Sequence, residues 1–312
     1  MTFTFYPLRL QFRAVDVVRF PGGKAANVLR GAFGCVFRQL ACDPACPGTA
    51  ACPRRDSCPY AAVFEPESRG VGPSGLADLP RPFVFRARSV DGRAVSPGDD
   101  FHFDLNVFHS DPRTAALFIL TFARIGEQGL GPGRGRAHLT NASLLGLDGQ
   151  PGAPLYRDGI LLHEPFQPVQ FPLAAEPAAR LRIEFLTPTE LKVDGGLAAT
   201  PEFPALFARA RDRVSTLRAL YGAGPLDADF RALGERAGQV RRIHCDVRRV
   251  DVSRRSSRTG QTHSLGGFTG SATYEGHLDE FVPYLRAAIW TGVGRQTVWG
   301  KGEIAVTVPV VY

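Results

Sequence analysis

A glycine-rich loop with two cations lies near the end of the sequence and has the composition of a phosphate-binding element. It reads Gly292-Val293-Gly294-Arg295-Gln296-Thr297-Val298-Trp299-Gly300-Lys301-Gly302. Glycine has no Cβ, so backbone N–H groups in such a loop can approach an anion closely, and two cationic side chains add charge. We therefore predict phosphate contacts here, and a flexible hairpin connection is the alternative. The predicted contact residues are Gly292, Gly294, Arg295, Gly300, Lys301 and Gly302.

Two other basic stretches fit a polyanionic partner. A second glycine-rich loop, residues 126–136, carries Arg134 and Arg136. Between residues 241 and 258, seven arginines against two aspartates give a net charge of +5, most of the +7 of the whole chain. Charge this concentrated favours nucleic acid as a partner over general solubility, although a solvated arginine-rich surface is the alternative. From this stretch the predicted RNA contacts are Arg248, Arg249, Arg254, Arg255 and Arg258.

Four cysteines lie close together in a segment of proline and small residues. Cys42, Cys46, Cys52 and Cys58 fall within seventeen residues. Without a signal peptide, such spacing favours metal binding over disulfides. Four thiolates can complete a tetrahedral structural zinc site, while an iron–sulfur cluster or free thiols are the alternatives.

Other classes of protein are disfavoured by the sequence. At 312 residues the chain suits two domains of ordinary size. No apolar run reaches the roughly 18 residues that span a bilayer, and the first residues lack a secretory signal. We expect a soluble, cytoplasmic protein with no membrane partner.

The hydrophobic periodicity predicts two similar domains. Strand patterns of period two and helix patterns of period 3.6 follow one another as strand, helix, strand, strand, helix, strand, and this order occurs twice. The fold class is therefore α+β, with tandem ferredoxin-like (RRM-like, βαββαβ) domains. We place the domains at 1–175 and 178–312. The first has a cysteine-rich insertion at 41–65, and the second contains the glycine-rich loop 292–302.

Three passages together resemble the RAMP superfamily, and most closely the endoribonucleases that process CRISPR repeat RNA. The loop 292–302 has the glycine, hydrophobic, glycine, five-residue, glycine, any, glycine pattern of that family. Residues 29–34 with 58–65, and residues 267–274, are similar to signatures of one subgroup. The resemblance implies binding of CRISPR repeat RNA and one cut per repeat by attack of the ribose 2′-OH. It implies no metal for catalysis and a 2′,3′-cyclic phosphate on the product.

The resemblance also directs attention to the first helix, where many family members carry a proton-transferring histidine. The helix expected between Lys24 and Leu40 contains no histidine. We therefore predict Lys24 and Arg30 as charge-stabilising residues and His138 as the proton-transfer group, with His244 and His263 as further candidates. The alternative function is a non-catalytic RAMP subunit that holds guide RNA in an effector complex with other Cas proteins.

Overall fold

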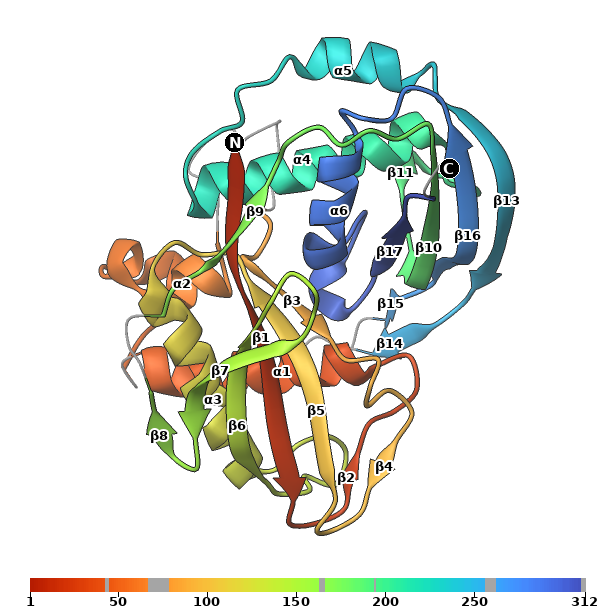
Figure 1. Ribbon diagram of the computed structural model, residues 1–312. Helices are drawn as coiled ribbons and strands as arrows, with labels where there is room; N and C mark the ends of the chain where they lie inside the picture. Colours follow the sequence, from red (N-terminus) through yellow and green to blue (C-terminus); the bar gives the residue numbers. More distant parts are fainter. Residues whose placement is uncertain (43–44, 67–78, 163–165, 194, 256–261, 310–312) are drawn as a thin grey trace. The chain divides into compact units, whose positions relative to one another are not determined.

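The computed structural model describes residues 1–42, 45–66, 79–162, 166–193, 195–255 and 262–309, and its ribbon is shown in Figure 1. The chain forms two compact units. Residues Thr4–Val169 make the N-terminal unit, and Met1–Phe3 together with Gln170–Tyr312 make the C-terminal unit. Each is α+β, as the periodicity predicts. Among the described residues, no helix combines the length and the apolar character needed to cross a bilayer.

The N-terminal unit has the ferredoxin-like strand order. Its central sheet runs β3-β5-β1-β6 and continues into β7 and β8, with antiparallel neighbours throughout. The elements are β1 (Thr2–Ala14), β2 (Val18–Arg19), α1 (Ala25–Ala41), η1 (Thr49–Ala51), η2 (Arg55–Ser57), α2 (Pro59–Val63), β3 (Phe83–Arg86), β4 (Ala94–Val95), β5 (Asp100–Val107), α3 (Pro112–Gln128), β6 (Ala137–Leu145), β7 (Pro151–Arg157) and β8 (Ile160–Leu161).

An aromatic core joins the two long helices of this unit to one face of the sheet. Phe33 of α1 stacks on Phe118 of α3 with ring centroids 4.2 Å apart, and both rings contact Phe83 of β3. In the second half of β1, Leu8, Leu10 and Phe12 are buried, whereas the residues between and after them, Arg9, Gln11 and Arg13, are more exposed. Helix α3 begins at Pro112 and is capped by Asp111, whose carboxylate accepts a hydrogen bond from the Arg113 amide at 2.9 Å.

The C-terminal unit repeats the same order. Its sheet runs β13-β16-β10-β17, with antiparallel neighbours. The elements are β9 (Val169–Pro172), β10 (Arg180–Thr189), β11 (Lys192–Val193), β12 (Gly196–Leu197), α4 (Phe203–Tyr221), α5 (Phe230–Ala237), β13 (Arg241–Val250), β14 (Ser253–Arg255), β15 (Thr262–Ser264), β16 (Gly267–Glu275), α6 (Val282–Thr291), η4 (Thr297–Trp299) and β17 (Ile304–Thr307). The tandem ferredoxin-like fold is confirmed.

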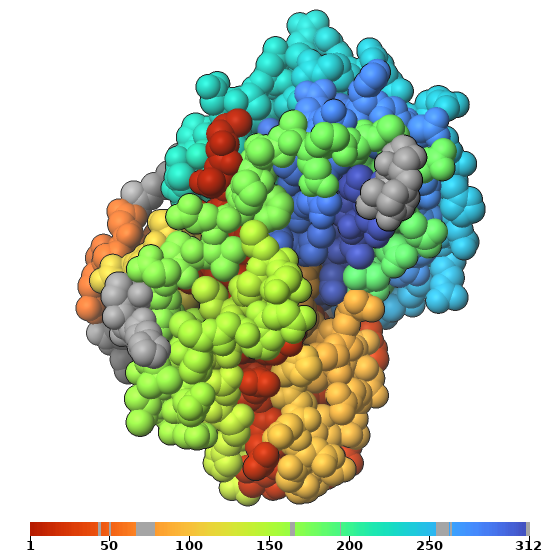
Figure 2. All heavy atoms as spheres, viewed as in Figure 1, coloured from red at the N-terminus to blue at the C-terminus, as the bar shows by residue number. Residues whose placement is uncertain are grey.

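The core of this unit lies between the sheet and helices α4 and α6. Phe207 of α4 meets Phe281, just before α6, with ring centroids 4.6 Å apart. Tyr274 of β16 is fully buried and donates a hydrogen bond to the Pro201 carbonyl at 2.6 Å, so it belongs to the core. Helix α5 was not predicted from the sequence. It lies at the surface, where Figure 2 shows it in cyan at the top of the view, and most of its residues are exposed.

Candidate functional site

The glycine-rich loop occupies the position that the sequence predicts, between α6 and β17. Its backbone is left-handed at Gly292, Gly294, Gln296, Gly300 and Gly302. A Cβ on Gly294 would lie 2.3 Å from the Glu190 carbonyl oxygen, and one on Gly302 would lie 2.0 Å from the carbonyl oxygen of Val293. The glycines are therefore required by close packing of backbone against backbone as well as by their dihedral angles.

A buried carboxylate holds this loop in place. Glu190, which follows β10, accepts hydrogen bonds from Arg295 at 2.7 Å and from Lys301 at 3.1 Å. The Lys301 side chain is 3% exposed, whereas that of Arg295 is 53% exposed. Burial lowers the pKa of Lys301, and the neighbouring Glu190 carboxylate opposes that shift. Of the two predicted phosphate-binding cations, Arg295 is therefore the one that solvent can reach.

Many amides of the loop are used inside the protein. Arg295 N donates to the Glu190 carbonyl, Gly302 N to the Pro188 carbonyl, and Val293 N to the Gly302 carbonyl, at 2.9–3.1 Å. These amides cannot also bind phosphate. The loop thus presents a fixed cationic side chain more than a cradle of backbone donors.

The second glycine-rich loop, predicted at residues 126–136, spans residues 129–136, because α3 continues to Gln128. Its turn is closed by the pairing of Leu130 with Gly135. Arg136 donates to the Asp16 carboxylate at 2.7 Å, and this contact lowers the pKa of Asp16. Arg134 is exposed and donates to the Gln128 carbonyl at 3.1 Å. Both arginines lie at the surface, but the charge of Arg136 is already partly neutralised by Asp16.

The predicted arginine cluster lies on and beyond β13, the edge strand of the C-terminal sheet. Arg248 and Arg249 are exposed there, and Arg249 approaches the Asp251 carboxylate at 3.3 Å. Arg254 and Arg255 lie in β14 but their side chains are not described, and Arg258 lies outside the described residues. The apolar alternation of residues 240–252 slips across Arg248-Arg249, which predicts a β-bulge at that point, and this prediction is wrong. The pairing with β16 shifts register between Arg242 and His244 instead.

Lys24 precedes α1, and the start of that helix is capped by an aspartate from another segment. The Asp91 carboxylate accepts hydrogen bonds from the amides of Gly23, Lys24 and Ala25 at 2.7, 3.2 and 3.1 Å. An anion therefore already occupies the positive end of the helix, where a phosphate would otherwise bind. The Lys24 side chain at this point is half-buried.

Arg30 lies further along α1 and packs on an aromatic ring. Its guanidinium carbon is 4.8 Å from the ring centroid of Phe64, a residue that follows α2. The same ring fills the space beside Gly34, where a Cβ would come within 2.2 Å of it. Gly31 has nothing within 4 Å of its Cβ position. One helix glycine is thus explained by close approach of another element, and the other faces open space.

His138 lies on a different face of the N-terminal unit. It is exposed on β6, opposite Arg13 of β1, on the side of the sheet that α1 and α3 do not cover. This agrees with the parity of the strand. The structure therefore does not bring His138 next to Arg30 within this unit. Two of the other histidines, His244 on β13 and His263 on β15, lie in the C-terminal unit, and the His263 side chain is not described.

Sequence patterns did not point to Glu190, Asp91 or His102. Glu190 and Asp91 each act on a segment far from them in the chain, so no local spacing reveals them. His102 lines a hollow of about 300 Å³ with Gln11, Asp100 and Thr140 on the exposed face of the N-terminal sheet. Burial lowers the pKa of His102, and Arg9 adds to this shift.

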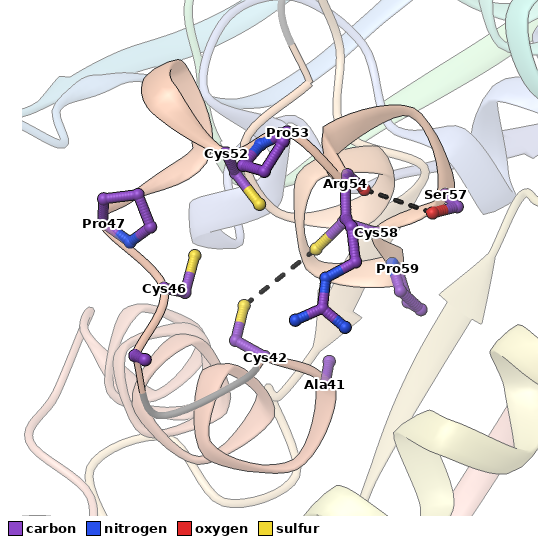
Figure 3. A pocket seen from close by; sticks show the side chains of 11 residues that line it. Ala41, Cys42, Cys46, Pro47, Cys52, Pro53, Arg54, Ser57, Cys58 and Pro59 are labelled. Atoms are coloured by element: carbon purple, nitrogen blue, oxygen red, sulfur yellow. Dashed lines mark hydrogen bonds between the residues drawn. The ribbon is translucent and has the colours of Figure 1, made fainter.

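The four clustered cysteines line one pocket, shown in Figure 3. The Cys42 and Cys58 sulfurs are 4.0 Å apart, and all four cysteines are free thiols. Burial raises the pKa of Cys42 to about 12, and the neighbouring thiols add to the effect. Within the described residues, no group of three or more His, Cys, Asp or Glu side chains is placed so that it could hold a metal ion. The structure brings the predicted ligands together, and the metal itself stays a prediction.

Family models match both halves of the chain. Residues 3–167 match a model named AF_1859_N and described as an N-terminal domain, which is more than half of the 312 residues. Residues 183–304 match the model of the CRISPR-associated endoribonuclease Cas6. A search of curated proteins found no match.

Solved structures share the whole fold. A product complex of Cas6 (TTHB231) is 16% identical with a TM-score of 0.59, covering 97% of this chain and 100% of that one. Thermus thermophilus Cas6 (TTHB231) gives 14% and 0.53, covering 98% and 99%. A partial Cas6-RT-Cas1–Cas2 complex gives 12% and 0.57, covering 99% of this chain and 47% of that one. At these identities the likeness shows a fold similar to that of Cas6.

Proposed function

We propose a function for this chain, which belongs to the AF_1859_N family and carries a Cas6 endoribonuclease domain over residues 183–304. The protein cuts CRISPR repeat RNA into guide RNAs in the cytoplasm. The ribose 2′-OH attacks the adjacent phosphate, the 5′ oxygen departs, and the upstream product keeps a 2′,3′-cyclic phosphate. This cleavage requires no metal, because the nucleophile is already tethered to the phosphate that it attacks.

The observation that carries this proposal is the Glu190-held loop with its exposed arginine. One cation of the loop is buried against Glu190, and the other, Arg295, reaches solvent on a backbone fixed by internal hydrogen bonds. A cation on a rigid support binds phosphate without first losing conformational freedom. Arg248 and Arg249 on the exposed edge strand add positive charge to the same unit. We infer that the RNA backbone follows these groups.

Three residues of the N-terminal unit are the proposed participants in cleavage. Lys24 and Arg30 stabilise the charge that develops on the phosphorane, since a cation favours the transition state over the less charged ground state. His138 is the proposed proton-transfer group, for removal of the proton from the 2′-OH or for protonation of the departing 5′ oxygen. Because His138 lies on the other face of this unit's sheet, its role requires RNA to reach both faces. The effect of His138 on the cleavage rate is therefore measured in a separate variant from the effects of Lys24 and Arg30.

A second candidate function is guide-RNA binding without cleavage. The observation that favours it is the first helix, α1, which contains no histidine. One similar structure, the partial Cas6-RT-Cas1–Cas2 complex, contains Cas6 together with Cas1 and Cas2. In this second function the chain would hold RNA for such partners.

One experiment distinguishes the two functions. The full chain is incubated in EDTA with end-labelled repeat RNA under single-turnover conditions, with Lys24→Ala, Arg30→Ala and His138→Ala in parallel. We expect one discrete product, with the Lys24 and Arg30 variants slower by about a hundredfold or more. The His138 variant should be slower and should have an altered rate profile near neutral pH. Tight binding with no product would support the second function. If all three variants cleave at the rate of the parent protein, the proposed catalytic residues are wrong. His244 and His263 are then the next residues to test.

A further inference from the structure

The cysteine-rich insertion combines four thiols with very little core of its own. Between α1 and α2 the described backbone forms two 3-10 turns, η1 and η2, and η2 has no buried residue. Cys42 follows the last residue of α1, and Cys58 precedes the first residue of α2. We propose that Cys42, Cys46, Cys52 and Cys58 bind one structural zinc ion that fastens the end of α1 to the start of α2.

The spacing of the Cys42 and Cys58 sulfurs suits two ligands of one tetrahedral ion, although no three ligands among the described residues already form a metal site. With a Zn–S distance of about 2.3 Å, two sulfurs of a tetrahedral site lie about 3.8 Å apart. The Cys42 and Cys58 sulfurs are 4.0 Å apart, and the Cys46 thiol interacts with those of Cys42 and Cys52. Figure 3 shows the four side chains directed toward a shared pocket of about 320 Å³. The four sulfurs surround the pocket, and an ion would draw them the remaining distance inward.

Disulfide bonds do not explain this arrangement. A disulfide requires sulfurs about 2.05 Å apart, and the described contact is nearly twice that length. Four thiolates with Zn²⁺ carry a net charge of −2. Arg54 lines the same pocket, and Arg38 acts electrostatically on Cys46, so positive charge is close to the site. Thiolate ligands of this number select zinc or an iron–sulfur cluster over hard cations such as magnesium.

The consequence of the ion lies in the packing of α2 against α1. Tyr60 of α2 meets Phe37 of α1 with centroids 6.0 Å apart, and Phe64 packs beside Gly34 and under Arg30. A segment with so few buried contacts gains most of its order from a bound metal. The zinc therefore stabilises the short helix whose following residue, Phe64, supports Arg30. This inference does not depend on RNA cleavage.

Metal analysis of the full chain, purified without chelator, tests the site. We expect about one zinc per chain, and loss of that zinc in Cys42→Ser, Cys46→Ser, Cys52→Ser and Cys58→Ser. Cys35→Ser is the matched control, because Cys35 is exposed on α1 and does not line the pocket. That variant should keep its zinc.

A second measurement on the unaltered protein covers the case in which the variants fail to fold. A strong chelator should release the zinc and make the insertion sensitive to protease, and added zinc should restore resistance. Protein without metal, or equal loss of zinc in Cys35→Ser, would overturn the proposal. Iron in place of zinc, together with visible absorbance, would overturn the zinc assignment and indicate an iron–sulfur cluster. RNA cleavage is scored separately, so failure of the nuclease proposal leaves this result unaffected.

Discussion

Lys301 donates a hydrogen bond to the Glu190 carboxylate across 3.1 Å, although 111 positions of sequence separate the two residues. Both side chains are less than 10% exposed. The pair fixes the glycine-rich loop against the segment that follows β10. A charged residue that the sequence suggests as a phosphate ligand is thus part of the support for its exposed neighbour, Arg295.

Removal of Lys301 should destabilise the C-terminal unit. Lys301→Ala leaves a buried carboxylate without one of its partners, which costs about 3–5 kcal/mol in the free energy of unfolding. Arg295→Ala is the control at the same carboxylate, and the exposure of its side chain limits its cost to about 1 kcal/mol. Urea unfolding followed by circular dichroism measures both. Equal effects of the two substitutions would show that burial of Lys301 has no energetic role.

Arg295→Ala should weaken RNA binding through the loss of one phosphate contact. For single-stranded RNA, the slope of log affinity against log salt should decrease in magnitude by about 0.7. Arg113→Ala is a suitable control. Arg113 carries the same charge at the exposed start of α3, where its side chain pairs with Asp111. Filter-binding titrations at several salt concentrations give the slopes. An Arg295 variant with the parent slope would place the loop outside the RNA interface.

The two glycines of α1 should respond oppositely to alanine. A Cβ at Gly34 enters the ring of Phe64, so Gly34→Ala should lower the free energy of unfolding by about 1–3 kcal/mol. A Cβ at Gly31 meets open space, so Gly31→Ala should raise it by about 1 kcal/mol through helix propensity. Thermal unfolding of the two variants provides the comparison. Destabilisation by Gly31→Ala would contradict the described packing.

Acidification below neutral pH should destabilise the N-terminal unit through His109. Burial lowers the pKa of His109, against a smaller opposing effect of Asp111. Because the unfolded chain binds a proton at this residue more readily than the folded chain, stability falls as pH decreases from the ordinary histidine pKa, about 6.5, toward the folded value. The imidazolium would also lose the hydrogen bond that His109 Nδ1 accepts from the Asp111 amide at 3.2 Å.

The variant His109→Asn tests that assignment, because its amide oxygen can accept the same hydrogen bond without titrating. Its stability should depend less on pH between 7.5 and 5 than that of the parent, as measured by urea unfolding at each pH. His102, whose pKa burial also lowers, contributes in the same direction and remains in both proteins. An unchanged pH dependence would assign the acid sensitivity to other groups.

The repeated fold was predictable from sequence because hydrophobic periodicity reports burial on one face of each element. The order strand, helix, strand, strand, helix, strand that the periodicity predicts for each half is the order of the main sheet strands and long helices in each unit. Helix α5 was missed. It is eight residues long, and two of its residues, Leu233 and Ala237, are buried, too few to set a clear period.

The site was predictable in composition but not in arrangement. The clustered cysteines and the glycine-rich loop are local in sequence, so their spacing was visible. The roles of Glu190 and Asp91 depend on contacts across 111 and 66–68 positions, and only folding brings these carboxylates to their partners. The same limit applies to Lys301, whose burial no local pattern reveals.

The measurement that tests the central claim most directly uses two repeat RNAs that differ in one oxygen. The cut is first mapped on the all-ribose RNA in EDTA, and a second RNA then carries a 2′-deoxy nucleotide immediately 5′ of the scissile phosphate. Cleavage by 2′-OH attack predicts one product with a 2′,3′-cyclic phosphate from the first RNA. It predicts equal binding and no cleavage of the second. Cleavage of the 2′-deoxy RNA at the same position, or of the first RNA only when a metal is supplied, would contradict the account.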